Sequence, residues 1–408
     1  MSLKSNGMPH RRVLMLLLSF IGLGLIFIQS CRQQGDRNKI QPVSKPKPAD
    51  LGTVSALPLQ FNSPTDNPVT ENKIELGRLL FYDPILSGNK DVSCASCHHP
   101  EFGYAESLEL PIGVNGKGFG SERHFVHPND IPFSKRNAPA VVNTAFNGID
   151  VSGDYKPEEA PMFWDSRVKS LEVQALQPIK QLEEMRGRQY EEHEILQVVV
   201  KRLRAIPEYK RLFKVAFGED ADAITEVNIA KALASFQRSL VANNSRFDAY
   251  MRGDVNALTQ SEKEGMQLFM ESGCARCHSG PMLSDFKPHV LGVAENEKLK
   301  LIDSGMNKSF AFRTPTLRNL RFTAPYMHSG KLKTLEQVLT FYEDLHGKPL
   351  PNPNVKKEQL DTLAIQTRVA FKNIPRIVEF LNTLNDDKFD RKVPGAVPSG
   401  LPVGGNIK

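Results

Sequence analysis

A short pattern of two cysteines and a histidine, Cys-x-x-Cys-His, occurs twice in this chain and constrains its structure more than any other feature. Covalent haem attachment uses this spacing: each thiol adds to one haem vinyl group, and the histidine is carried under the ring as an iron ligand. A zinc site can share cysteines and histidines, but zinc does not demand a histidine directly after the second cysteine. The sequence therefore predicts two c-type haems. Their attachment residues are Cys94, Cys97, His98, Cys274, Cys277 and His278.

The fifth cysteine, Cys31, lies in a different context, because the two motifs use four of the five cysteines. Residues 1–31 are predicted to be a lipoprotein-type signal sequence, with basic residues before an apolar run that is too short for a confident membrane span. The end of this run resembles a bacterial lipobox, in which Cys31 is lipidated; an uncleaved anchor helix is the alternative. In either case we expect a protein of the bacterial periplasm, anchored to a membrane.

Residues 32–56 are polar and rich in lysine and proline, which predicts a tether between membrane and enzyme. Removing residues 1–31 takes away three basic residues and no acid, so the formal charge falls from +6 to +3. So small a net charge does not indicate a nucleic-acid-binding surface, and we expect no nucleic-acid partner.

An internal repeat extends beyond the haem motifs. Residues 137–146 align without gaps against residues 313–322, and residues 169–172 align with residues 333–336. The repeat predicts an all-α fold of two cytochrome c-like domains, each with one covalent haem, packed about a pseudo-twofold axis.

Local patterns support this fold. Apolar residues at helical spacing predict a helix over residues 70–82, and a capping box at residues 261–264 predicts a matching helix before the second motif. One long helix is expected over most of residues 223–250, with Thr225 as N-cap, and another over 377–384.

The predicted domains are 57–250 for the N-terminal one and 251–386 for the C-terminal one. The Pro/Gly-rich residues 387–408 are predicted to be a disordered tail.

The repeat also predicts that the two haems have different distal neighbours. Residues 334–337 form a capping box that opens a helix, and Tyr342 lies on the same face of that helix as Leu335. In the first copy, the residue that corresponds to Tyr342 is Pro178. Proline cannot ligate iron, so haem one keeps an open position, whereas a Tyr342 phenolate can cap haem two. On spacing alone, a buried core tyrosine is the favoured interpretation of Tyr342.

These motifs resemble the bacterial di-haem cytochrome c peroxidase and MauG family over most of residues 55–386. The matching segments are residues 94–98, 136–139, 163–165, 174, 178, 184–185, 274–278, 313–319 and 323–330. The resemblance implies that haem one is the reaction site and that haem two accepts electrons from outside. It assigns Glu184 as the acid–base group, Gln174 as its polar neighbour, and Trp164 as the electron path between the haems.

The chemistry agrees with this assignment, because heterolytic cleavage of a peroxide needs a group that takes a proton from one oxygen and returns it to the other. Without the resemblance, Glu184 would be read as part of a charged surface turn and Trp164 as a core residue. The resemblance further implies a calcium ion, held by the side chain of Asn137 and the backbone carbonyls of Thr323 and Pro325. Such oxygen donors suit calcium.

The chain departs from the peroxidases of this family at two positions. They carry a methionine where this chain has Tyr342, as MauG-like members do. They often place a removable histidine over haem one, where this chain has Asn129. His124 and His127 lie nearby and could supply a loop ligand, although isolated histidines in a polar loop are more typically exposed.

The sequence thus predicts a di-haem oxidoreductase that reduces hydrogen peroxide with electrons from a small c-type cytochrome or cupredoxin. One alternative is a MauG-type enzyme that oxidises a specific protein substrate. Another is a di-haem electron carrier without turnover, which would need a ligand on both faces of both haems. Pro178 and Glu184 argue against the carrier.

Overall fold

The computed structural model describes residues 53–218 and 223–407. The predicted signal sequence, Cys31 and most of the predicted tether lie outside the described residues. Where the structure begins, the tether prediction is wrong: Val54 is buried among apolar side chains of the second half, and the N–H of Gly280 donates to the carbonyl of Thr53. Within the described residues, no helix is both long and apolar enough to cross a membrane.

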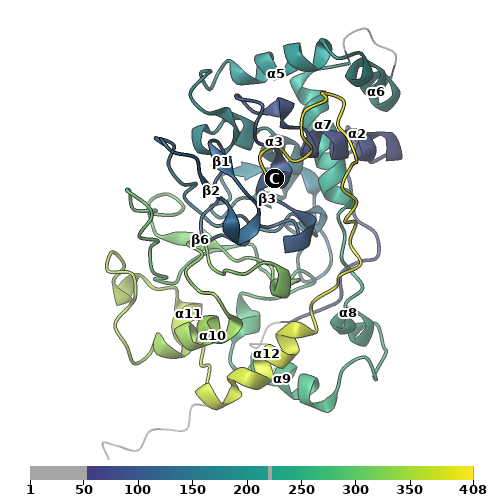
Figure 1. Ribbon diagram of the computed structural model, residues 1–408. Coiled ribbons are helices and arrows are strands. Elements are labelled where there is room, and N and C mark those ends of the chain that lie inside the picture. The colour runs from purple at the N-terminus through teal and green to yellow at the C-terminus, as the bar shows by residue number, and fades with distance from the viewer. Residues whose placement is uncertain (1–52, 219–222, 408) are drawn as a thin grey trace, which may run out of the picture. The chain divides into compact units, whose positions relative to one another are not determined.

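The described chain is rich in helices and poor in strands (Figure 1). The helices are α2 (Glu71–Tyr82), α3 (Leu171–Ala175), α4 (Gln177–Lys180), α5 (Ile195–Arg204), α6 (Pro207–Phe217), α7 (Glu226–Ser239), α8 (Arg246–Met251), α9 (Gln260–Glu271), α10 (Leu335–Asp344), α11 (Thr362–Gln366) and α12 (Ile374–Asn382). Three small antiparallel sheets pair β1 (Gly116–Lys117) with β2 (His124–Phe125), β3 (Pro161–Met162) with β4 (Val168–Lys169), and β5 (Pro288–Val290) with β6 (Ala311–Arg313). These short sheets are the departure from a purely α-helical fold.

The helix before each haem motif crosses a later helix at a glycine. In α2, a β-carbon on Gly77 would overlap the carbonyl of Ala232 in α7; in α9, a β-carbon on Gly265 would overlap the carbonyl of Arg376 in α12. Only glycine lets two helix backbones approach this closely. The same crossing in both halves is a structural counterpart of the internal repeat.

The caps of these helices confirm part of the prediction. Thr70 caps α2, because its side chain accepts from the N–H of Lys73. The predicted box at residues 261–264 is wrong, since Thr259 and Glu262 form the capping box of α9. Thr334 caps α10 as predicted, and Ser170 caps α3 at the corresponding place in the first half.

Two apolar cores lie one in each half. The first gathers side chains from α2, α5, α6 and α7, and the second gathers side chains from α9, α10 and α12. Thr225 caps α7 as predicted, but the predicted helix over residues 223–250 is two helices, because the chain leaves helical geometry at Leu240 before α8 begins. Phe247 of α8 already packs in the second core, although the domain division at residues 250 and 251 stays a prediction.

The C-terminal segment is ordered, which corrects the predicted disordered tail. From α12 the chain runs back to the helices of the first half (Figure 1, yellow). Phe389 and Val397 are buried in the first core, and Asp390 forms an ion pair with Arg78 at 2.7 Å. The N–H of Gly404 donates to the carbonyl of Tyr82 at 2.8 Å. Burial of a few apolar side chains therefore outweighs the Pro/Gly-rich composition.

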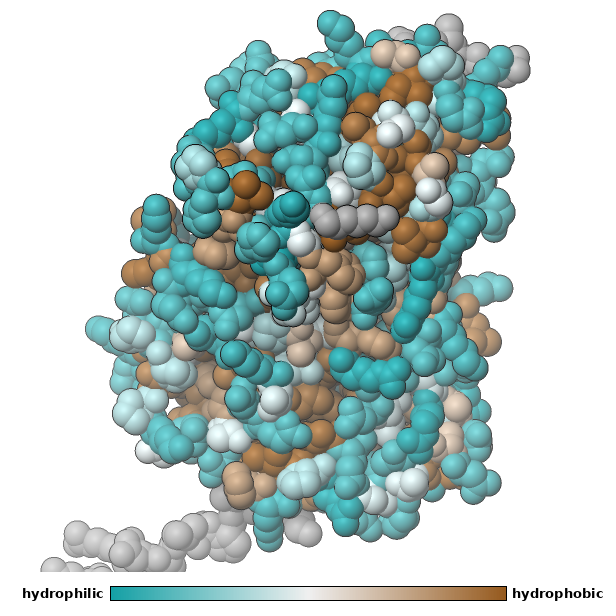
Figure 2. All heavy atoms as spheres, in the orientation of Figure 1, coloured by the Kyte–Doolittle hydropathy of each residue, from teal (hydrophilic) through white to brown (hydrophobic). Residues whose placement is uncertain are grey.

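Hydrophilic residues predominate on the face shown in Figure 2, and hydrophobic residues show between them, notably at the upper right, where α2, α7 and the C-terminal segment lie in Figure 1.

Candidate functional site

One cavity of about 590 Å³ is lined by both Cys-x-x-Cys-His motifs. Each motif begins with a single 3₁₀ turn, η3 (Cys94–Ser96) in the first half and η9 (Cys274–Arg276) in the second. None of the four cysteines forms a disulfide, and all four line the cavity together with His98 and His278.

The two histidines are held in the same way. The Nδ1 of His98 lies 2.9 Å from the carbonyl of Tyr104, and the Nδ1 of His278 lies 2.9 Å from the carbonyl of Leu283. A carbonyl can only accept, so Nδ1 carries the proton and Nε2 keeps its lone pair for a metal. Burial lowers the pKa of both rings, which favours the neutral form that ligates iron. The residues present therefore fit a covalently bound haem at each motif.

The residues expected above haem one are the predicted acid–base group and its polar neighbour. Gln174 on α3, Pro178 on α4 and Glu184 on the π-helical turn η8 (Leu182–Arg186) all line the cavity. The backbone of Glu184 is packed against Gly113, where a β-carbon would overlap the Glu184 carbonyl. That contact fixes the turn from which the carboxyl group projects.

The carboxyl group of Glu184 is not in an ordinary surface environment. Burial, together with the neighbouring Glu183 carboxylate, raises its pKa to about 7, and the Arg167 guanidinium acts in the opposite direction. A carboxyl with a pKa near neutral pH exists in both protonation states, as an acid–base group must.

In the second half, Tyr342 on α10 lines the same cavity and is partly buried. Burial raises the pKa of its phenol, so the phenol stays neutral unless a nearby cation stabilises the anion. Leu335 and Leu339 share its helix face and belong to the second core. Met282 and Met327 also line the cavity, whereas Met306 does not.

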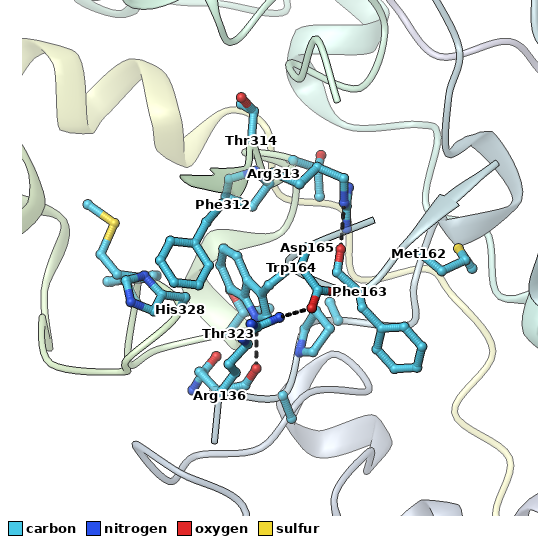
Figure 3. Close-up of a pocket in the computed structure, with 18 of the residues that line it drawn as sticks. Arg136, Met162, Phe163, Trp164, Asp165, Phe312, Arg313, Thr314, Thr323 and His328 are labelled. Carbon is cyan, nitrogen blue, oxygen red and sulfur yellow. Dashed lines mark hydrogen bonds and ion pairs between the residues drawn. The ribbon is translucent and has the colours of Figure 1, made fainter. Parts of the chain in front are cut away.

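Trp164 lies where the two halves meet (Figure 3). Its Nε1–H donates to the carbonyl of Asn137 at 2.9 Å, and its ring makes an edge contact with His328, with centroids 6.4 Å apart. His328 in turn stacks on Phe312 at 3.5 Å between centroids. Burial lowers the pKa of His328 to about 4, so this aromatic group carries no charge at neutral pH.

A chain of ion pairs runs beside Trp164. Asp165 binds Arg167 at 2.8 Å and Arg136 at 2.8 Å, and Arg136 reaches Asp303 of the second half at 2.6 Å. The Arg167 guanidinium also lies over the ring of Phe163, 3.6 Å from its centroid. No pattern in the sequence singles out Asp303. Its partner, Arg136, lies within a motif that matched the family.

Arg313 is a buried cation that lines the cavity. Its Nε–H donates to the carbonyl of Phe163 at 2.9 Å, and burial lowers its pKa to about 10 (Figure 3). A buried guanidinium needs an anionic partner, and a haem carries carboxylates. This is a second observation that fits haem in the cavity.

Asn137, Thr323 and Pro325, the residues expected to bind calcium, all line this cavity. The Asn137 Nδ2–H donates to the carbonyl of Leu108 at 3.0 Å, which leaves its side-chain oxygen for another partner. The loop histidines behave as isolated polar residues: His124 and His127 are exposed, and neither lines the cavity.

The chain is similar in sequence to known di-haem proteins. The model of the di-haem cytochrome c peroxidase family matches residues 71–256. The cytochrome c551 peroxidase of Nitrosomonas europaea is 33% identical over 339 residues, covering 81% of this chain and 85% of that protein. The methylamine utilization protein MauG of Methylorubrum extorquens is 36% identical over 284 residues, covering 68% of this chain and 70% of that protein.

Among solved structures, a MauG-like protein associated with microbial copper homeostasis superposes with a TM-score of 0.66 at 27% identity, covering 81% of this chain and 94% of that chain. The diheme peroxidase BthA of Burkholderia thailandensis has the same fold, with a TM-score of 0.61 at 20% identity over 84% of this chain and 92% of that chain. The chain therefore belongs to the di-haem cytochrome c peroxidase family, which implies two haem c groups, and it is a peroxidase-like oxidoreductase.

Proposed function

We propose that this protein reduces hydrogen peroxide at the first haem motif, with electrons that enter through the second. The observation that carries the proposal is that Glu184 and Gln174 line the same cavity as His98, next to Pro178, which cannot ligate iron. Two cytochrome c-like domains, each with one covalent haem, are part of the proposal.

When bound, the first haem supplies an iron at which the O–O bond of peroxide is cleaved. The ionised Glu184 would take a proton from one oxygen of the peroxide and return it to the other oxygen, which would leave as water. Gln174 offers an amide N–H and a carbonyl that orient the peroxide by hydrogen bonds. The raised pKa of Glu184 suits both halves of this transfer near neutral pH.

Trp164 is proposed as the path between the two haems. Its position at the meeting of the two halves, and its contacts with Asn137 and His328, support this role. A calcium ion held by Asn137, Thr323 and Pro325 is proposed to brace the same region, since each residue contributes an oxygen of the kind calcium prefers.

The location and the partners are also proposed. The predicted signal over residues 1–31 supports a periplasmic protein with a lipid anchor, and electrons would then come from a small c-type cytochrome or cupredoxin. Steady-state peroxide turnover with a reduced small cytochrome tests the function. If no such donor supports turnover and the enzyme instead oxidises a specific protein, the peroxidase function is replaced by the second candidate function, described next.

That second candidate is a MauG-type enzyme that oxidises a specific protein by long-range electron transfer. Tyr342 favours it, because this tyrosine lines the cavity in the second half at the position where family peroxidases carry methionine. Turnover on candidate partner proteins, compared with turnover on a reduced cytochrome, separates the two.

The haem content is the first prediction. Protein expressed with a haem-maturation system should carry two covalent haems, because each motif presents two thiols and a neutral histidine to the cavity. Intact mass spectrometry measures this directly. Replacing both Cys274 and Cys277 by alanine should remove one haem and leave the other, and a wild-type mass with one haem or none would contradict the prediction.

The second prediction concerns Trp164→Phe, which should slow electron transfer between the haems while both stay bound. Phenylalanine fills most of the same space but is harder to oxidise, and it loses one hydrogen bond worth about 1 kcal/mol. Peroxide oxidation followed by absorbance at both haems measures the rate. Phe312→Leu is the control, since it removes a neighbouring ring and keeps the tryptophan. An unchanged rate in Trp164→Phe would exclude this path.

A further inference from the structure

The two haem motifs fold alike, but their outer faces differ. In each motif the backbone N–H of the histidine donates to the carbonyl of the first cysteine at 2.9 Å. The residue before the second cysteine is Ser96 in the first motif and Arg276 in the second. These two positions mark the same place on the two halves, so what covers each of them can be compared directly.

The chain's own C-terminal segment covers the first motif. The Ser96 hydroxyl donates to the carbonyl of Gly404 at 2.9 Å, and the N–H of Asn406 donates to the carbonyl of Asp91 at 2.8 Å. Gly405 forms a bridge with Val92, and Ser96 is only 6% exposed. A protein partner therefore cannot reach this face without displacing the segment.

The second motif has a different neighbour, the end of α11 and the stretch that leads from it to α12. The Arg276 guanidinium donates to the side chain of Gln366 at 3.0 Å, and the N–H of Arg368 donates to the carbonyl of Ser272, just before the motif, at 2.9 Å. This stretch lies close to the motif, but several of its side chains are exposed to solvent. We call Arg276, Ile365, Arg368, Phe371 and Lys372 the motif-two face.

Phe371 gives the motif-two face an apolar centre. Its side chain is 72% exposed, and it is the only aromatic residue that is largely exposed in the part of the chain that the structure describes. Ile365 nearby is 41% exposed. Leaving one such side chain in water forgoes the stabilisation that its burial would supply. A single exposed apolar residue needs no explanation, but one beside a haem motif and among cations does.

The charges on this face share one sign. Arg368 and Lys372 are exposed on either side of Phe371 in the sequence, and Arg276 is partly exposed. Aromatic and arginine side chains are the residues that most often carry binding energy at protein interfaces. A cationic rim attracts an acidic partner and raises the rate of encounter at low ionic strength.

We propose that the motif-two face is the docking surface for an electron-donor protein whose own contact face has an apolar centre and an acidic rim. The proposal rests on the proposed function, in which electrons enter at the second haem. Each docking event passes one electron from the reduced donor to the haem held by Cys274 and Cys277. Two such electrons and two protons convert one hydrogen peroxide to two waters. The covered first motif restricts the donor to the second half.

The test compares the variant Phe371→Ser/Lys372→Glu with wild-type holoenzyme in steady-state peroxide turnover. The donors are a small c-type cytochrome with an acidic haem edge, one with a basic haem edge, and a small diffusible reductant. At low ionic strength the KM for the acidic cytochrome should rise about tenfold or more with little change in kcat, because the variant removes the anchor and reverses a charge. Turnover with the small reductant should not change.

A matched control is Val227→Ser/Lys210→Glu, which makes the same kinds of change at exposed residues of the first half. It should leave the KM for both cytochromes unchanged. If the haem spectrum shows that the double variant is disturbed, Lys372→Glu alone decides, since its side chain is exposed. With that single variant, a higher KM for the acidic cytochrome together with a lower KM for the basic cytochrome supports the proposal.

Two outcomes would overturn the docking surface while the proposed function stands. One is an unchanged KM for the acidic cytochrome in a variant with intact small-reductant turnover. The other is a dimer that Phe371→Ser dissociates in sedimentation, which would assign the face to a second copy of this chain. If wild-type enzyme turns over peroxide with neither the cytochromes nor the small reductant, the proposed function itself fails.

Discussion

Glu184→Gln is expected to lower peroxide turnover by about 100-fold or more and to leave both haems in place. Glutamine has nearly the same size and fits the same turn of η8, but its amide cannot take up a proton and return it. The carboxyl of Glu184 lines the cavity beside Gln174, and its raised pKa allows both steps near neutral pH. Rapid mixing with hydrogen peroxide and steady-state turnover measure the loss.

The pH dependence follows from the same residue. Glu184 must be ionised to accept the proton, and its pKa is raised to about 7 by burial and by Glu183. The ionised fraction therefore falls as the pH drops through about 7. Wild-type turnover should fall with it, which gives the pH profile an acid limb. In Glu184→Gln the acid limb should be absent, because the titrating group is gone.

Glu183→Gln is the matched control, since it removes the adjacent carboxylate from the same turn. Most of the turnover should remain, and the acid limb should move to lower pH, because the Glu183 charge contributes to the raised pKa of Glu184. A Glu184→Gln enzyme with wild-type turnover and an unchanged acid limb would remove Glu184 from the mechanism.

The features that the sequence predicted best depend on short spacings. The two haem motifs, the helix over residues 70–82 and the cap at Thr334 each depend on residues a few positions apart, so their geometry is local. The repeat was visible for a different reason: a domain copied within one chain keeps its motifs in order. The glycine crossings at Gly77 and Gly265 could also have been found, because each glycine stands four residues before a phenylalanine.

The C-terminal segment was mispredicted because composition averages over a stretch, whereas packing depends on individual residues. Proline and glycine dominate residues 393–400, yet Phe389 and Val397 reach the first core and Asp390 binds Arg78. The break between α7 and α8 was missed because an apolar stripe continues through Leu240. At that point the residue is buried, but the backbone is no longer helical.

The candidate site was only partly predictable, because its electrostatics join distant segments. Arg136 binds Asp303 across 167 positions in the sequence, and His328 meets Trp164 across a similar span. No local pattern indicates such pairs. The raised pKa of Glu184 likewise depends on burial, which no local pattern indicates, so the sequence alone could assign this residue only through the family resemblance.

Tyr342→Met is expected to raise the reduction potential of the second haem by on the order of 100 mV or more, because a thioether stabilises ferrous iron relative to a phenolate. Tyr342→Phe should change the spectrum of that haem and open its iron to small ligands. Both results follow if Tyr342 ligates the second haem. The phenol lines the cavity, and burial raises its pKa, so only a cation as close as the iron would hold it as the anion. Redox titration and absorption spectra measure both effects.

Tyr326→Phe is the control for this prediction, since Tyr326 lines the same cavity but donates its hydroxyl to the carbonyl of Leu320 at 2.9 Å. Its loss should leave the spectrum and the potential of the second haem as they are. A near-infrared band of His–Met ligation in the wild type, or an unchanged spectrum in Tyr342→Phe, would contradict tyrosine ligation. Met282 and Met327, which also line the cavity, would then be the ligands to test, and the chain would be a methionine-ligated peroxidase in place of a MauG-like enzyme.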